Sequence, residues 1–250
     1  MSNHDNWIPE WTDLKIAISL LSRIPVRNEN EQLQARGPNQ AWAFPIVGIL
    51  VGFFSCCLAW IGLLLELNNF AVGFLIVTGA ALVTGAMHYD GLADTLDGLW
   101  GGWTPSQRLE IMKDSHIGVY GVIGLVISLG LQAALYGQII QQSIWPIIGI
   151  MTISRAVMVP VMGLLKNPRT SGLSSQVGQP KIQTIFLAMA LGIIVSLLTG
   201  SWAAIGGAIL AAFTIAKIAK SKIGGQTGDI LGATQQLAEV SALVCVAAVL

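Results

Sequence analysis

Residues 69–98 read NFAVGFLIVTGAALVTGAMHYDGLADTLDG: they begin as an uncharged apolar run of membrane-spanning length and end with three aspartates. Asp90, Asp94 and Asp97 are offset by four and seven residues, which returns to one side of an α-helix. We therefore expect a helix that carries all three carboxylates on one stripe about two turns long. Their mutual repulsion requires a cation, and carboxylate oxygens suit magnesium, which commonly bridges to a substrate phosphate. The stretch predicts phosphoryl chemistry at a membrane edge.

The composition is that of a membrane protein. Of the 250 residues 54% are hydrophobic and only 10% are charged, whereas a soluble domain carries about 25% charged residues. The 13 basic and 13 acidic residues balance, so nothing in the net charge suggests nucleic acid as a partner. Cys56, Cys57 and Cys245 lie inside apolar runs and lack the spacing of a zinc site or a disulfide framework.

Apolar segments of spanning length predict about seven transmembrane helices in one membrane-embedded domain, residues 1–250. The segments are 43–65, 69–87, 117–137, 145–164, 183–199, 202–219 and 231–250. Only Gly200 and Ser201 separate the fifth from the sixth, so a single long kinked helix is an alternative there. The fold class is an all-α, polytopic integral membrane helix bundle.

The basic residues predict the orientation. Twelve of the thirteen would lie at one end of this bundle, before the first span or after the second, fourth and sixth, and Arg155 lies within a span. The positive-inside rule assigns that end to the cytoplasm. We therefore expect a multi-pass protein of the bacterial inner (cytoplasmic) membrane with a cytoplasmic N-terminus.

The segment before the first span, residues 1–40, is predicted to be cytoplasmic. Apolar residues recur at helical spacing in 13–24, beside Lys15 and Arg23, so this part could lie flat along the inner membrane surface. A short packing helix is an equally good interpretation. Residues 27–40 are polar and are expected to form an exposed loop.

Two further aspartates should face the same membrane edge as the aspartate helix. Asp114 stands three residues before the 117–137 span, and Asp229 opens the last span. We predict that metal ligands come from Asp90, Asp94, Asp97, Asp114 and Asp229, although a solvated loop is the plainer interpretation of any one of them.

Other residues near this edge could bind an anionic ligand. Gly225 and Thr227 lie in the run GGQTGD at 224–229, whose backbone N–H groups could approach a phosphate, although a flexible connector would look similar. Arg155 is a charge within an apolar span, where it needs a partner or a pocket. Together with Lys113 and Arg169 it completes the predicted substrate-binding set. Glu239, in the last span, could equally make a structural hydrogen bond.

These residues resemble the cobalamin synthase family, also called adenosylcobinamide-GDP ribazoletransferase, over almost the whole chain. The matching pieces are SRIPV at 22–26, FPIVG at 44–48, His88 through Gly98, MKDSHIG at 112–118, Ser154-Arg155 and GQTGD at 225–229. The aspartate run is the most specific of them.

The resemblance implies a membrane enzyme of the last steps of vitamin B12 assembly. It would join adenosylcobinamide-GDP to α-ribazole or its 5′-phosphate, release GMP, and require Mg²⁺. An aspartate among Asp90, Asp94 and Asp97 would act as general base towards the ribose 3′-hydroxyl, and the sequence does not decide which. Arg155 and the basic loops would neutralise the leaving GMP.

Other classes of protein share some of these features. A CDP-alcohol-type phosphotransferase acting on a lipid uses a related but longer aspartate pattern. A cation-coupled secondary transporter would use Arg155 and Glu239 for its substrate and the aspartates for a cation. Against a transporter, the acids gather at one membrane face and no inverted repeat is visible. An oligomer is compatible with everything in the sequence.

Overall fold

The structure is a computed structural model and describes residues 8–26, 36–168 and 178–250. Every regular element within these ranges is a helix. In chain order the elements are α1 (Trp11–Leu21), the 3-10 helix η1 (Gly37–Ala43), α3 (Phe44–Leu64), α4 (Asn69–Thr84), α5 (Met87–Gly101), α6 (Pro105–Ile111), α7 (Val119–Ile139), α8 (Pro146–Ala156), α9 (Met158–Leu164), α11 (Ile182–Leu198), α12 (Trp202–Ile223) and α13 (Gly228–Ala247). The predicted all-α class is confirmed.

The apolar helices agree broadly with the predicted spans. Five helical stretches are long and apolar enough to cross a membrane: η1 with α3, α7, α8 with α9, α12, and α13. The bent pair α4 and α5 raises this number to six, and α11 is apolar but shorter. Between α11 and α12 the chain turns through Gly200, whose φ of 76° is left-handed, so the alternative of one long kinked helix is wrong.

The predicted span over 69–87 is confirmed as an apolar helix but ends three residues early, because α4 ends at Thr84. Gly85 and Ala86 follow with φ of 62° and 59°, and the chain enters α5 at an angle of 93°. Two successive left-handed residues break the helical hydrogen-bond pattern and redirect the chain. The aspartate helix is therefore a separate element, set at a steep angle to the apolar helix before it.

Two elements form the centre of the bundle. The segment α8–α9 and the helix α13 are mostly buried, and they pack against α3, α5, α7, α11 and α12. The outer helices expose large apolar side chains such as Phe53, Trp60, Phe186 and Leu210, as expected for surfaces that face lipid.

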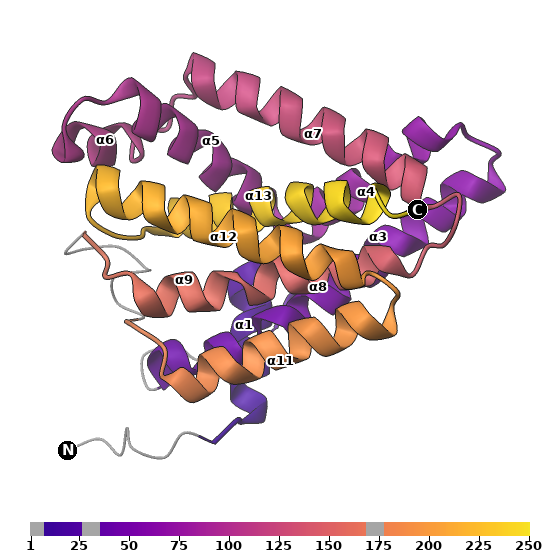
Figure 1. Cartoon of the computed structure of the whole chain (residues 1–250), viewed down its shortest axis with the longest axis horizontal. Coiled ribbons are helices and arrows are strands. Elements are labelled where there is room, and N and C mark those ends of the chain that lie inside the picture. Colours follow the sequence, from indigo (N-terminus) through magenta and orange to yellow (C-terminus); the bar gives the residue numbers. More distant parts are fainter. Residues whose placement is uncertain (1–7, 27–35, 169–177) are drawn as a thin grey trace.

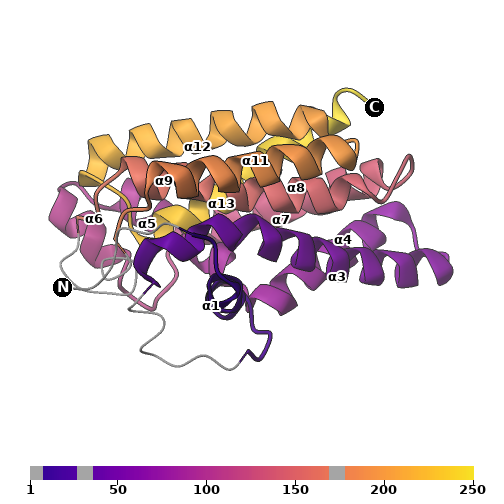
Figure 2. The same cartoon turned by 90° about the horizontal axis from the view of Figure 1, so that it is seen from below.

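The long helices run roughly along the longest axis of the molecule, with α6 at one end and the C-terminus at the other (Figure 1). Figure 2 shows α1 almost end-on, so this helix crosses the direction of the bundle. Its buried residues, Ile16, Ala17 and Leu21 among them, pack towards η1 and α3. α1 is therefore a packing helix. That it also lies along the inner membrane surface stays a prediction.

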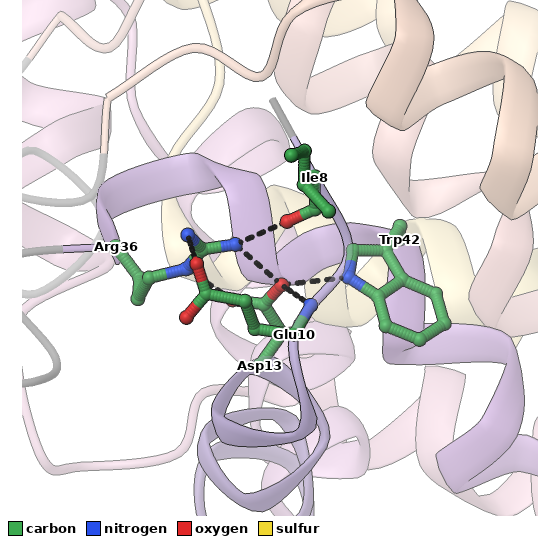
Figure 3. A network of polar contacts seen from close by, with 5 residues as sticks. All are labelled: Ile8, Glu10, Asp13, Arg36 and Trp42. Carbon is green, nitrogen blue, oxygen red and sulfur yellow. Dashed lines mark hydrogen bonds and ion pairs between the residues drawn. The ribbon is translucent and has the colours of Figure 1, made fainter. Parts of the chain in front are cut away.

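A polar clamp joins α1 to η1 (Figure 3). Arg36 donates through Nε to Asp13 Oδ1 at 2.7 Å and through Nη2 to Asp13 Oδ2 at 2.8 Å. Trp42 Nε1 donates to the same Asp13 Oδ2 at 2.9 Å. Burial opposes the charge on Asp13, but these bonds together hold the pKa of its carboxyl below its usual value. Arg36, expected in an exposed loop, is instead mostly buried and fixes α1 in place.

Candidate active site

The helix α5 carries the three predicted catalytic aspartates, which confirms that they share one helix. Their surroundings differ. Asp90 is exposed, Asp94 is half-buried and Asp97 is buried. The carboxylate stripe thus runs from an accessible end at Asp90 to an enclosed end at Asp97, and its members have different neighbours.

Asp97 is engaged by the start of α7. Its Oδ2 accepts a hydrogen bond from the backbone N–H of Gly118 at 2.7 Å, and its Oδ1 accepts one from the N–H of Gly121 at 2.9 Å. These N–H groups belong to the first turn of α7, which has no helical acceptors for them. A carboxylate there also interacts favourably with the helix dipole. Asp97 therefore has a structural role, because its two hydrogen bonds join α5 to the start of α7.

Asp229 is brought to the aspartate helix by two glycines. A Cβ built on Gly91 would lie 3.2 Å from the Cα of Asp229, and one built on Gly232 would lie 3.3 Å from the Cα of Gly91. Such contact allows α5 and α13 to cross with their backbones touching. Gly91 directly follows Asp90, so the structure places the start of α13 beside the accessible end of the aspartate stripe.

The run 224–229 is held by the loop that follows α9. The backbone N–H of Gln226 donates to the carbonyl of Lys166 at 3.0 Å, and a Cβ on Gly225 would overlap that carbonyl. Thr227 caps α13, accepting from the N–H of Ile230 at 3.3 Å and donating to Asp229 Oδ2 at 3.2 Å. Close packing explains why position 225 is a glycine. A phosphate contact by Gly225 or Thr227 stays a prediction.

Arg155 lies at the end of α8 with an exposed fraction of 1%. Its Nη1 donates to the carbonyl of Met151 at 2.9 Å, while its Nε has no hydrogen-bond partner among the described residues. Glu239, which is also buried, is close enough to attract its charge. A buried guanidinium with an unused donor is suited to bind an anion.

A continuous polar network connects α5, α7, α8 and α13 inside the bundle. Tyr89 donates to Gln132 at 3.1 Å, and Gln132 donates to Gln236 at 2.8 Å. The network continues through bonds from Gln236 to Gln235, from Gln235 to Ser154 and Glu239, and from Tyr136 to Glu239. Glu239 is thus structurally hydrogen-bonded, one of the two interpretations left open by the sequence. Buried polar groups that are mutually satisfied fix the relative positions of helices.

Sequence reasoning missed this network, apart from Glu239. The signal was present as glutamines inside apolar spans, a residue type that is costly in hydrocarbon unless it is paired. No periodicity indicated which glutamines would meet.

The remaining predicted residues lie further out or outside the described ranges. Lys113 and Asp114 are exposed after α6, and Asp114 Oδ1 lies 2.7 Å from His116 Nδ1. That hydrogen bond lowers the pKa of the Asp114 carboxyl and raises the pKa of His116. Arg169 falls in residues 169–177, outside the described part of the chain.

The five predicted metal ligands do not form a single compact cluster. Within residues 8–26, 36–168 and 178–250, no three His, Cys, Asp or Glu side chains lie close enough to hold one ion together. The donor chemistry still fits magnesium, since Asp90 and Asp94 present carboxylate oxygens one helical turn apart and Asp229 starts α13 at the same crossing. The metal assignment stays a prediction.

Fold and site together define a polytopic helical membrane protein with an acidic helix and a buried arginine. Comparison with known families identifies the family to which this membrane protein belongs. The family of cobalamin-5-phosphate synthase matches residues 13–247, and the chain belongs to that family.

Curated relatives match over most of their length. A protein of Bradyrhizobium diazoefficiens is 37% identical over 244 residues, which cover 94% of this chain and 93% of the relative. A Sinorhizobium protein is 36% identical, with 92% and 94% covered, and one of Brucella anthropi is 34% identical, with 91% and 93% covered. All three bear the name adenosylcobinamide-GDP ribazoletransferase. No solved structure matches the chain significantly.

Proposed function

We propose that this chain is an adenosylcobinamide-GDP ribazoletransferase. It joins adenosylcobinamide-GDP to α-ribazole, or to α-ribazole 5′-phosphate, and forms adenosylcobalamin or its 5′-phosphate together with GMP. The family description and the names of relatives that match over most of their length support this activity. The observation that carries it in this molecule is the crossing of α5 and α13, which brings Asp229 to the aspartate helix.

The reaction is a displacement on phosphorus. The 3′-hydroxyl oxygen of the ribose attacks the phosphorus that carries the corrinoid alcohol, and the bond from that phosphorus to the oxygen of GMP breaks. The hydroxyl proton passes to a carboxylate, and GMP leaves with the electron pair of the broken bond. Asp90 and Asp94 are the accessible carboxylates of α5, so one of them is the base in this proposal.

Positive groups would bind the leaving nucleotide. The Nε of Arg155 has no partner among the described residues and can donate to a phosphate oxygen. Lys113, Arg169 and the turn at Gly225 and Thr227 supply further donors in this proposal. Their cationic charge would stabilise the charge that develops on GMP.

Asp90, Asp94 and Asp229, with Asp97 and Asp114 as further candidates, would hold Mg²⁺. When bound, the ion would neutralise charge on the attacking and leaving oxygens. We further propose that the protein lies in the inner membrane with this site open to the cytoplasm, because the end of the bundle at α6 carries the basic residues.

The test is GMP release by the purified protein given Mg²⁺, adenosylcobinamide-GDP and α-ribazole. We expect Mg²⁺-dependent release that Asp94→Asn abolishes while membrane insertion remains. Glu66→Gln, an equivalent acid-to-amide change in the turn at the opposite end of the bundle, is the matched control and should keep full activity. Uptake of substrate into vesicles without GMP release would refute the enzyme, and an active Asp94→Asn variant would remove the assignment of that aspartate.

A further inference from the structure

A second feature, apart from the aspartates of α5, is an apolar pocket at the start of α13. Its volume is about 130 Å³, and it lies where α1, α3, α5, α9 and α13 meet. The pocket is lined by Leu20, Leu21, Phe44, Met87, His88, Met158, Met162, Gly228, Leu231 and Gly232. Apolar cavities of about 150 Å³ accept a benzene-sized ring, and this pocket is open on one side, so a larger flat group can extend out of it.

Among the described residues that line the pocket, His88 alone has a polar side chain. Its exposed fraction is 2%, and neither ring nitrogen has a hydrogen-bond partner in the described part of the chain. A buried polar group without a partner loses its hydrogen bonds to water and gains none in return, which destabilises the fold. Its position therefore makes sense if a ligand supplies the missing partner.

Two of the residues that line the pocket are close in sequence to the aspartates of the proposed site. His88 precedes Asp90 by two residues on α5, and Gly228 directly precedes Asp229. Residues two apart on a helix point to opposite sides, so His88 and Asp90 leave different faces of α5. The pocket therefore meets the site through Gly228, and a ligand seated in it would lie beside the start of α13 at Asp229. The two methionines, Met158 and Met162, offer polarizable thioethers that pack well on aromatic rings.

We propose that this pocket binds the base of the acceptor nucleoside, and that His88 recognises a nitrogen of that base. The inference rests on the proposed function. The base of α-ribazole is a flat, bicyclic benzimidazole with an apolar dimethylated edge and one unsubstituted ring nitrogen. The apolar walls contact the ring, an N–H of His88 donates to the nitrogen, and the ribose extends past Gly228 towards Asp229 at the crossing of α5 and α13.

Lipid is the competing occupant, since an acyl chain also fits an apolar pocket in a membrane protein. An acyl chain, however, has no acceptor for His88. The apolar groove between α5, α12 and α13, lined by Leu210 and Trp100 among others, offers a comparison because exposed side chains on the outer surface form part of it.

The first experiment fills the pocket in the full-length protein held in nanodiscs. Met162→Trp should raise the KM for α-ribazole about tenfold or more and leave the KM for adenosylcobinamide-GDP little changed. The riboside of unsubstituted benzimidazole, which is smaller, should recover part of the loss. Leu210→Trp, in the outer groove, is the matched control and should change neither constant.

The second experiment tests His88 by equilibrium binding, without turnover. We compare α-ribazole with the corresponding indole riboside, in which a C–H replaces the free ring nitrogen. Wild-type protein should bind α-ribazole about tenfold more tightly than the indole analogue. His88→Phe should lose this preference, and His88→Asn, which keeps a donor, should retain part of it.

The outcomes separate this proposal from the proposed function. Absence of GMP release by the wild type would refute the function, while the binding comparison would still decide the pocket. Unchanged constants for α-ribazole in Met162→Trp, equal losses for both substrates, or the same nitrogen preference in His88→Phe would each overturn the pocket assignment. So would loss of a bound phospholipid in Met162→Trp, seen by native mass spectrometry, with unchanged α-ribazole affinity.

Discussion

At the scale of single residues, the three aspartates of α5 have separable roles. Asp97 accepts two backbone N–H groups of α7, whereas Asp90 is exposed. We expect Asp97→Ala to lower the free energy of unfolding by about 1–2 kcal/mol, as for other lost helix caps. Asp90→Asn should lose turnover but unfold at the wild-type temperature. Thermal unfolding in detergent measures the difference, and equal melting temperatures for Asp97→Ala and wild type would refute the capping role.

Arg155 and Glu239 form the second residue-scale case, because each is buried and charged near the other. In Arg155→Met, Glu239 keeps its bonds from Tyr136 and Gln235 but loses its cation. We expect a coupling energy of about 1–3 kcal/mol in the double-mutant cycle with Glu239→Gln.

The same cycle separates stability from function at Arg155. The double variant should regain stability relative to Arg155→Met but remain inactive, since the donor for the leaving nucleotide is gone. Recovery of GMP release together with stability would show that Arg155 acts only through the fold.

The sequence predicts which helix carries the three aspartates, but not which residues of other helices they contact. The spacing of Asp90, Asp94 and Asp97 is enough to place them on one helix, because helical periodicity is a local property. That Asp97 meets Gly118 and Gly121 depends on how α5 packs against α7, and no local pattern contains this information.

At the scale of elements, the clamp between α1 and η1 decides whether α1 can form one wall of the His88 pocket. Arg36→Met would leave the Asp13 carboxylate buried without its cation, so we expect a loss of about 3–5 kcal/mol in unfolding free energy. Glu10→Gln, which changes only the half-exposed partner of Arg36, should cost about 1 kcal/mol or less.

The pH dependence of this clamp follows from the lowered pKa of Asp13. The clamp's contribution is fully present above the unfolded-state value of 3.8 and is lost as the pH falls through the lower folded-state pKa. Unfolding measured between about pH 2 and 6 should therefore show, below the unfolded-state value, an acid-induced loss in wild type that is smaller in Arg36→Met. Equal acid sensitivity of the two proteins would refute the clamp.

Element prediction succeeds where hydropathy alone suffices and fails where backbone conformation matters. Lengths and boundaries of α3, α7 and α12 follow from their apolar runs. The bend between α4 and α5 depends on left-handed Ala86, a conformation that alanine rarely adopts, so an apolar run through Gly85 and Ala86 predicts a continuous helix.

At the scale of the whole molecule, charge asymmetry should set the orientation in the membrane. Helix α6 and the C-terminal end of α12 lie at the end of the bundle opposite the C-terminus (Figure 1). They carry Arg108, Lys220 and Lys222, whereas the turns 65–68, 140–145 and 199–201 contain no Lys or Arg. The positive-inside rule therefore assigns the α6 end to the cytoplasm, which is also where the proposed substrates would enter.

Cysteine labelling tests this orientation in intact bacterial cells. In a variant lacking Cys56, Cys57 and Cys245, we introduce either Ser106→Cys in α6 or Gln142→Cys in the turn before α8, both at exposed positions. A membrane-impermeant maleimide should label Gln142→Cys at once and Ser106→Cys only after the cells are permeabilised. GMP release is measured on both variants, and a variant that has lost this activity is treated as misfolded and is not used to assign the orientation. The reverse labelling pattern in active protein would place the aspartate helix on the outer side and overturn the proposed cytoplasmic site.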